Sequence, residues 1–283
     1  MTNGGTQPGM TAAAAVIAVE SGGTRELVDD LATEEPLEMR VRRGRHEFTA
    51  AVTMRTPGHD FELAAGFLFA EGIVRRRDAV VGIAYCLDPS MDAAQRYNVV
   101  TTELATLEAD QVHRLERHFS ISSACGVCGK TSIDALATRA KPVEDRVRVP
   151  FEQLSALPSR MRDAQRVFAS TGGLHAAALF APSGTLLAVR EDVGRHNALD
   201  KTIGWALLNA NVPLTGCAAI VSGRASFELV QKCIVAGIPI LCAVSAPSSL
   251  AVQLAQEFGV TLLGFVREGR ANVYAGAERI AFS

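Results

Sequence analysis

Two cysteines stand two residues apart in the segment Ser122-Ser123-Ala124-Cys125-Gly126-Val127-Cys128-Gly129-Lys130. A Cys-X-X-Cys pair can relay sulfur, exchange a disulfide or supply half of a zinc site. The glycines of the segment add backbone freedom, and the positive charge of Lys130 favours the thiolate form. Thiol chemistry is therefore the first hypothesis, with Cys125 and Cys128 as the candidate catalytic residues.

A zinc-binding module is one alternative use of the pair. His113 and His118 lie just upstream, but their order and spacing match no zinc-finger pattern. The zinc deaminase signature also fails, because Ala124 replaces its proline and none of the six histidines begins a His-X-Glu. We expect no metal ligands, and a zinc module would instead predict stoichiometric zinc on Cys125 and Cys128.

Two enzymatic alternatives remain. The stretch from Ala124 to Thr131 fits a relaxed phosphate-loop pattern with alanine for its first glycine. Phosphate binding leaves both cysteines unexplained, and the best magnesium ligand, Asp192, is separated from its apolar strand by Arg190-Glu191. A phosphate-loop hydrolase would depend on Lys130 and survive loss of the cysteines. A thiol-disulfide oxidoreductase, which needs no sulfur donor, is the nearest rival.

Composition narrows the class of protein. The chain has 283 residues of which 48% are hydrophobic, enough to bury a sizeable core. A net charge of -2 argues against a general nucleic-acid or anionic-membrane surface. The apolar run 12–19 lacks a preceding basic residue, and no stretch reaches the roughly 20 apolar residues of a membrane helix. We therefore expect a cytoplasmic protein with no nucleic-acid or membrane partner.

The remaining cysteines do not form pairs along the chain. Each is embedded in apolar sequence, which is typical of small core residues in a reducing compartment. They are Cys86, Cys217, Cys233 and Cys242.

The first half of the chain predicts a small α+β subdomain over residues 25–118. Residues 1–24, rich in Gly, Thr and Ala, predict a disordered tail. Alternating apolar residues predict a hairpin over 39–54. Thr56-Pro57-Gly58 then opens a helix with apolar residues at helical spacing.

The second half predicts an α/β domain over residues 119–283 that carries the Cys-X-X-Cys loop. Strands and helices alternate along it: strands 174–180 and 185–189, helix 194–209, strand 217–221, helix 226–236, strand 238–244, helix 248–258 and strand 260–266. A β-α-β-α-β order implies parallel crossovers with helices on the sheet faces. The fold class is therefore α/β.

Four polar segments lie at the ends of these elements, where ligands usually bind an α/β sheet. They are 171–175, 190–197, 222–226 and 264–270. We expect them to form one pocket, in which Arg224 and free amides could hold a phosphate. Each also has an ordinary explanation: a hydrogen-bonded His175, a charged helix start with His196 and Asp200 on one face, helix capping by Ser222, and a solvated turn.

The motifs in this order resemble the FdhD family. The resemblance rests on the four segments, on the Cys-X-X-Cys loop and on three motifs near the predicted first helix: Thr56-Pro57-Gly58, Glu62-Leu63-Ala64-Ala65-Gly66-Phe67-Leu68 and Glu71-Gly72-Ile73. It implies a cytidine-deaminase-like α/β domain, with a mixed sheet flanked by helices, beside a smaller N-terminal subdomain.

The resemblance also implies a function. Family members are sulfurtransferases that take persulfide sulfur from a cysteine desulfurase and pass it to the molybdenum or tungsten bis(molybdopterin guanine dinucleotide) cofactor of formate dehydrogenase. It makes Cys125 the persulfide carrier, assisted by Cys128, and implies a homodimer without a resident metal. It also assigns cofactor binding to Phe265, Val266, Arg267, Glu268, Gly269 and Arg270.

Overall fold

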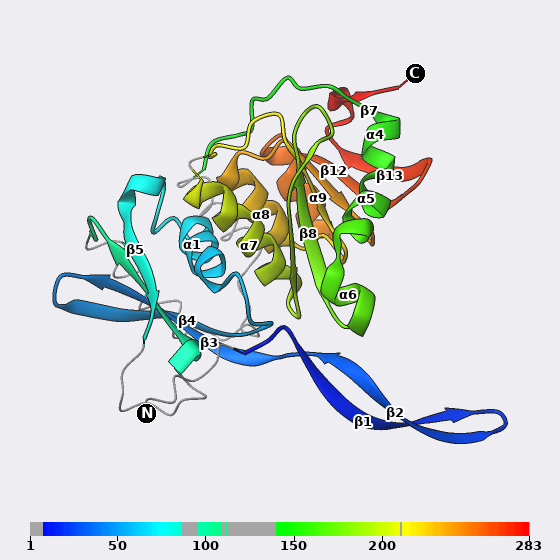
Figure 1. The fold of residues 1–283 in the computed structure, drawn as a ribbon. Coiled ribbons are helices and arrows are strands. Elements are labelled where there is room, and N and C mark those ends of the chain that lie inside the picture. The colour runs from blue at the N-terminus through cyan, green and yellow to red at the C-terminus, as the bar shows by residue number, and fades with distance from the viewer. Residues whose placement is uncertain (1–7, 87–95, 109–110, 112–139, 210, 283) are drawn as a thin grey trace.

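A six-stranded mixed sheet forms the centre of the protein in the computed structural model, which describes residues 8–86, 96–108, 111, 140–209 and 211–282. Its strands, in spatial order, are β13 (Arg270–Ala275), β12 (Thr261–Arg267), β11 (Ile240–Ala243), β10 (Ala218–Val221), β8 (His175–Phe180) and β9 (Leu186–Asp192). The three central strands β10, β11 and β12 are parallel, and the outer strands are antiparallel to their neighbours. The predicted α/β class, with a mixed sheet flanked by helices, is confirmed (Figure 1).

Helices cover both faces of this sheet because its strands alternate between two apolar clusters. Ala177 and Leu179 of β8 face one cluster, whereas Ala178 and Phe180 face the other. The helices that contribute to the first cluster are α7 (Arg195–Leu208), α8 (Phe227–Ala236) and α9 (Ser249–Glu257). Those that contribute to the second are α4 (Phe151–Ser155) and α5 (Leu157–Ala164), and α6 (Arg166–Thr171) follows them along the chain. The sequence did not predict these last three helices.

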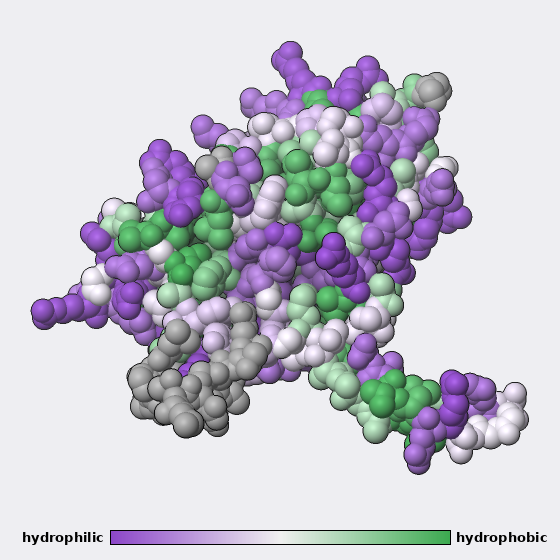
Figure 2. Space-filling view, viewed as in Figure 1, coloured by the Kyte–Doolittle hydropathy of each residue, from purple (hydrophilic) through white to green (hydrophobic). Residues whose placement is uncertain are grey.

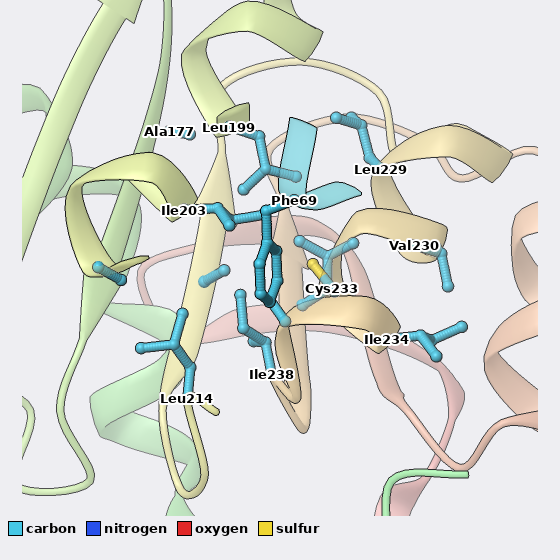
Figure 3. Packing of buried hydrophobic residues seen from close by; sticks show 14 of the residues in the cluster. Phe69, Ala177, Leu199, Ile203, Leu214, Leu229, Val230, Cys233, Ile234 and Ile238 are labelled. Carbon is cyan, nitrogen blue, oxygen red and sulfur yellow. The ribbon is translucent and has the colours of Figure 1, made fainter. Parts of the chain in front are cut away.

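A second sheet of four strands forms the N-terminal part. Its order is β4 (His46–Arg55), β3 (Glu35–Arg43), β6 (Val99–Leu104) and β5 (Val80–Tyr85). The antiparallel β3–β4 pair is the predicted hairpin, and its turn uses Gly44 at φ 59°. The predicted first helix is α1 (Asp60–Ala70), which packs Leu63 on the four-stranded sheet and sends Phe69 into the main core (Figure 3). This helix therefore joins the two sheets.

Two glycines allow α1 to lie directly against α7. A side-chain carbon at Gly66 would overlap the carbonyl oxygen of Asp200, and one at Gly204 would overlap that of Glu62. Only glycine permits such close backbone approach. The crossing brings the start of α7, which carries several candidate site residues, into contact with the N-terminal part of the chain.

The structure corrects the expected tail over residues 1–24 from Thr11 onward, whereas residues 1–7 lie outside the described residues. Strand β1 (Thr11–Glu20) pairs antiparallel with β2 (Gly23–Ala32) in an arm that projects from the body of the protein (Figure 1). Val16, Ile17 and Val19 are β-branched residues that favour a strand, and Ser21-Gly22 provides a two-residue turn. The expectation of a disordered tail relied on composition and overlooked these β-branched residues.

Short elements complete the described chain: β7 (Val149–Pro150), β14 (Ile280–Ala281) and the 3-10 turns η1 (Arg77–Ala79), η2 (Arg96–Asn98) and η3 (Ala277–Arg279). None of the helices in these ranges has the length and apolar character to cross a membrane. The predicted boundary between residues 118 and 119 lies outside the described residues, so the division into subdomains stays a prediction.

Candidate functional site

The predicted thiol pair lies outside the described residues. Residues 112–139 include Cys125, Cys128 and Lys130, as well as His113 and His118. The structure therefore leaves the two catalytic residues as predictions. Among the residues that it does describe, no three or more His, Cys, Asp or Glu side chains form a group that could hold a metal ion.

Three of the described cysteines are core residues, as the sequence predicted: Cys217, Cys233 and Cys242 are buried. Cys86 is only partly buried and is not a core residue. Burial raises the pKa of Cys233 and of Cys242 to about 12 each. These two thiols stay protonated at neutral pH and are poor nucleophiles. Sulfur chemistry at either position would be slow.

A cavity of about 430 Å³ opens where the parallel strands β10 and β11 end. Helices α5 and α6 form one wall, with Met161, Arg162, Gln165 and Phe168 among its residues. Loops that flank the strand ends form the other, with Gly172, Gly173, Leu174, His175, Val193, Ser222 and Val244. The carboxyl ends of parallel strands are the usual ligand site of an α/β sheet.

The four predicted polar segments meet around this cavity. Three of them contribute lining residues: His175, Val193 and Ser222. The fourth is tied to its edge, because Nη1 of Arg267 donates a hydrogen bond to the carbonyl oxygen of Val244 at 2.6 Å. Three of the four expected segments thus line one cavity, and the fourth contacts its edge without lining it.

His175 and Ser222 form the polar centre of the cavity wall. The Ser222 hydroxyl lies 3.3 Å from Nδ1 of His175 and accepts a hydrogen bond from the Ala176 amide at 2.9 Å. Ser222 therefore joins β10 to β8 and does not cap a helix, because the residue that directly precedes α8 is Ser226. Desolvation lowers the pKa of His175, and the positive charge of Arg195 lowers it further. We expect a neutral imidazole at pH 7.

Arg195, the first residue of α7, adds positive charge beside this pair. Its Nε is buried and has no hydrogen-bond partner among the described residues. Gly223 lies between the two side chains, since a side-chain carbon there would be 3.4 Å from the His175 ring and 3.6 Å from Cδ of Arg195. A buried donor without a partner favours an anionic ligand, because leaving it unpaired costs free energy.

A buried ion pair holds the turn that carries Arg195. Nζ of Lys201 lies 2.7 Å from Oδ2 of Asp192, and both side chains are fully buried. The same oxygen accepts the Thr56 amide, while Oδ1 accepts the Gly194 amide and Nδ2 of Asn197. With both oxygens engaged, Asp192 is a poor magnesium ligand, which weakens the phosphate-loop alternative. The pair instead fixes the start of α7 against the segment before α1.

His196 and Asp200 do lie four apart on α7, but each has its own partner. His196 Nε2 is 3.1 Å from the Ser226 hydroxyl and 3.7 Å from the Glu228 carboxylate. That histidine lowers the pKa of Glu228 to about 2. Both oxygens of Asp200 instead accept hydrogen bonds from Lys232, at 2.7 and 2.8 Å. The two residues therefore do not act as a pair.

The predicted cofactor segment extends β12 beyond its expected end. Phe265 has φ 52° at an irregular register and is 36% exposed, whereas Val266 is fully buried in the second core cluster. Glu268 and Gly269 form the turn between β12 and β13, and Arg270 opens β13 at the surface. Arg267 and Phe265 thus lie on the side of the segment that contacts residues 244–245 of the cavity edge.

Sequence reasoning missed the wall that α6 supplies. The Glu191 carboxylate accepts the amides of Val167 at 3.0 Å and Phe168 at 2.7 Å, and thereby caps the start of α6. In the sequence, the only indication of this role was the negative charge of Glu191 directly after a predicted strand. Arg162 then stacks 4.0 Å from the Phe168 ring.

The mixed sheet with a polar cavity at its strand ends defines an α/β protein with a candidate ligand site at the carboxyl ends of its parallel strands. Comparison with known proteins is more specific, because the model of the FdhD/NarQ family matches residues 32–281. The sulfur carrier protein FdhD of Streptomyces coelicolor is 52% identical over 269 residues, 94% of each chain. That of Thermoplasma volcanium is 39% identical over 274 residues, 96% of each chain. The chain belongs to the FdhD/NarQ family.

A solved structure supports the fold. The crystal structure of a formate dehydrogenase accessory protein from Desulfotalea psychrophila superposes with a TM-score of 0.74. The match covers 96% of this chain and 100% of that one at 24% identity. At this identity the comparison establishes the shared fold.

Proposed function

We propose that this protein is a cytoplasmic sulfur carrier that serves formate dehydrogenase. The observation that carries the proposal is membership of the FdhD/NarQ family together with an intact Cys125-X-X-Cys128 motif. Relatives that cover almost the whole chain are named sulfur carrier protein FdhD. The protonated, buried state of Cys233 and Cys242 supports the assignment of sulfur chemistry to the motif rather than to the core thiols.

Sulfur acceptance is a thiolate exchange at Cys125. The Cys125 thiolate attacks the outer sulfur of a persulfide on a cysteine desulfurase, and the sulfur–sulfur bond of the donor breaks. The desulfurase cysteine leaves as a thiolate, and Cys125 now carries the persulfide. One sulfur–sulfur bond forms as another breaks, so the step needs no oxidant.

Sulfur release requires a second nucleophile, and Cys128 supplies it. Attack of its thiolate on the inner sulfur of the Cys125 persulfide forms a Cys125–Cys128 disulfide and expels hydrosulfide. Hydrosulfide is the ligand delivered to the metal of the cofactor. A dithiol reductant then returns the pair to two thiols, which closes the cycle.

The substrate that receives the sulfur is a molybdenum or tungsten bis(molybdopterin guanine dinucleotide). Its diphosphate groups are anions of the kind that the Arg195 guanidinium would bind. Arg267 and Arg270 of the 265–270 segment supply further positive charge, and Arg267 is tied to the edge of the same cavity. We assign the dinucleotide to this cavity, with the glycines at 172–173 allowing close backbone approach.

Complementation tests this function. In a bacterial strain that lacks its own family member, the wild-type chain should restore formate dehydrogenase activity, and Cys125→Ala should not. Cys86→Ala is the matched control, since it removes a partly buried cysteine outside the motif and should restore activity. Full activity with Cys125→Ala, at equal protein level, would refute the proposal.

A further inference from the structure

A second cavity, of about 470 Å³, lies between the end of α1 and the end of α8, and we call it the α1–α8 cavity. It shares no lining residue with the cavity at the strand ends. The helical side of the protein carries apolar side chains bordered by polar ones (Figure 2). The lining of the α1–α8 cavity is mostly apolar, with Phe69, Ala70, Val74, Pro213, Ile234 and Val235.

The rim of the α1–α8 cavity is positively charged. Arg75 and Lys141 line it and are exposed, and none of the described residues that line it is acidic. Arg76 and Arg77 follow Arg75 in the sequence. Arg76 is paired with Asp78 at 2.7 Å, but the described residues contain no ion-pair partner for Arg75 or Lys141. Unpaired cations beside an apolar cavity favour an acidic partner that also carries an apolar group.

Both ends of the segment that contains the candidate thiols lie at this rim. Before the segment, Nε2 of Gln111 donates a hydrogen bond to the carbonyl oxygen of Ile73 at 2.8 Å. Ile73 is flanked on both sides by residues that line the cavity. After the segment, Ala140 and Lys141 are themselves lining residues. A protein bound here is therefore adjacent to both points where residues 112–139 join the described fold.

The two cavities lie toward opposite ends of α8. Ser222, shortly before α8 begins, lines the cavity that we assign to the dinucleotide, whereas Ile234 and Val235 in the last turn of α8 line the α1–α8 cavity. Helix α8 has ten residues and is therefore about 15 Å long. The sulfur acceptor thus leaves the α1–α8 cavity free, and a sulfur donor can bind there at the same time.

We propose that the α1–α8 cavity, with Arg75 and Lys141 at its rim, is the docking surface for the protein that donates sulfur to Cys125. An acidic segment of the donor contacts the two cations, and one of its apolar side chains enters the cavity. The buried apolar group supplies affinity, and the charges speed association. The inference rests on the proposed function, because that function identifies the partner as a sulfur donor.

Calorimetric binding of a cysteine desulfurase, without its cysteine substrate, tests the surface. The double variant Arg75→Glu/Lys141→Glu should weaken binding at least about tenfold, because two attractive contacts become repulsive. Arg43→Glu is the matched control, since it reverses an exposed arginine at the β3–β4 turn and should bind like the wild type. The proposal is overturned if the wild type does not bind, if the double variant binds as tightly, or if Arg43→Glu loses as much affinity.

The apolar contact is tested at Val235, which is partly buried and lines the cavity from α8. Val235→Asp should weaken desulfurase binding about tenfold or more, since it places a carboxylate in the apolar cavity and repels an acidic segment. Val252→Asp is the matched control, because Val252 of α9 is also partly buried against the main core but lies outside the lining. Equal affinities for the two variants, with circular dichroism unchanged, would overturn the proposal.

A small sulfur donor separates this inference from the proposed function. Glutathione persulfide needs no docking surface, so the wild type and Arg75→Glu/Lys141→Glu should gain sulfur from it equally. From the desulfurase, below saturation, the double variant should gain sulfur at least about tenfold more slowly. Equal rates from the desulfurase would overturn the docking proposal. If glutathione persulfide loads neither protein, the sulfur-carrier function fails, and calorimetry still decides whether the surface binds the desulfurase.

Discussion

His175 lines the cavity, and Arg195 lies close to it across Gly223, but the two side chains differ in charge. The half-buried guanidinium of Arg195 is positively charged. Desolvation and this neighbouring charge hold the pKa of His175 below its ordinary value of 6.5. This combination suits an anionic ligand. Arg195 supplies the positive charge, and the neutral His175 supplies a further hydrogen-bonding group.

Ligand binding should depend on Arg195. Arg195→Ala is expected to weaken the binding of guanosine diphosphate, a probe for the nucleotide half of the substrate, by about tenfold or more, since it removes charge-assisted hydrogen bonds. Arg148→Ala, at an exposed position outside the cavity lining, should leave the affinity unchanged. Titration calorimetry measures both. Equal affinities for the two variants would contradict the assignment of the phosphates to this cavity.

The pH dependence of stability should report His175. Because its pKa is lowered in the folded state, the unfolded chain binds the proton more readily below pH 6.5. The contribution of His175 to the free energy of unfolding is therefore complete above pH 6.5. It is lost as the pH falls from 6.5 through the lowered folded-state pKa.

Urea unfolding at a series of pH values measures this contribution. The wild type should lose more stability than His175→Gln over that window, and Arg195→Ala should raise the pKa of His175 in an NMR titration. Identical pH profiles for wild type and His175→Gln would show that the histidine titrates normally.

At the scale of elements, the α1–α7 crossing fixes the start of α7 and with it the cavity. Gly66→Ala forces a methyl group against the carbonyl oxygen of Asp200. We expect a loss of about 1–3 kcal/mol or more in the free energy of unfolding, as for other overpacked contacts. Gly82→Ala is the control, because a side-chain carbon at Gly82 has no neighbour within 4 Å. Urea denaturation that gave equal stabilities would refute the tight crossing.

Helices and strands could be predicted where an apolar run was bounded by glycine or by polar residues. The strand and helix alternation from residue 174 onward matches β8 to β12, because each buried run is bounded in this way. The arm was missed because its alanines resemble a tail, whereas the strand predicted over 260–266 matches β12 (Thr261–Arg267) to within one residue at each end. Helices α4 to α6 were not predicted, because they are too short to show a clear helical periodicity in the sequence.

At the scale of the whole molecule, one core links both sheets. Phe69 of α1 is buried with Leu199 of α7 and Cys233 of α8 in a single cluster. The four polar segments could be predicted as candidate site components because each lies at the end of a predicted strand or helix. Their partners could not, since Lys201 with Asp192 and Ser222 with His175 are joined only by the folded topology.

The central claim is that Cys125 carries sulfur, and intact-protein mass spectrometry tests it most directly. The protein is incubated with a cysteine desulfurase and cysteine, then compared with Cys125→Ala, Cys128→Ala and the control Cys86→Ala. The account predicts that wild type and Cys86→Ala gain about 32 Da per sulfur, removable by a dithiol, while Cys125→Ala does not. If Cys125→Ala gains the same mass, or if no variant gains sulfur while zinc copurifies with the wild type, the account is contradicted.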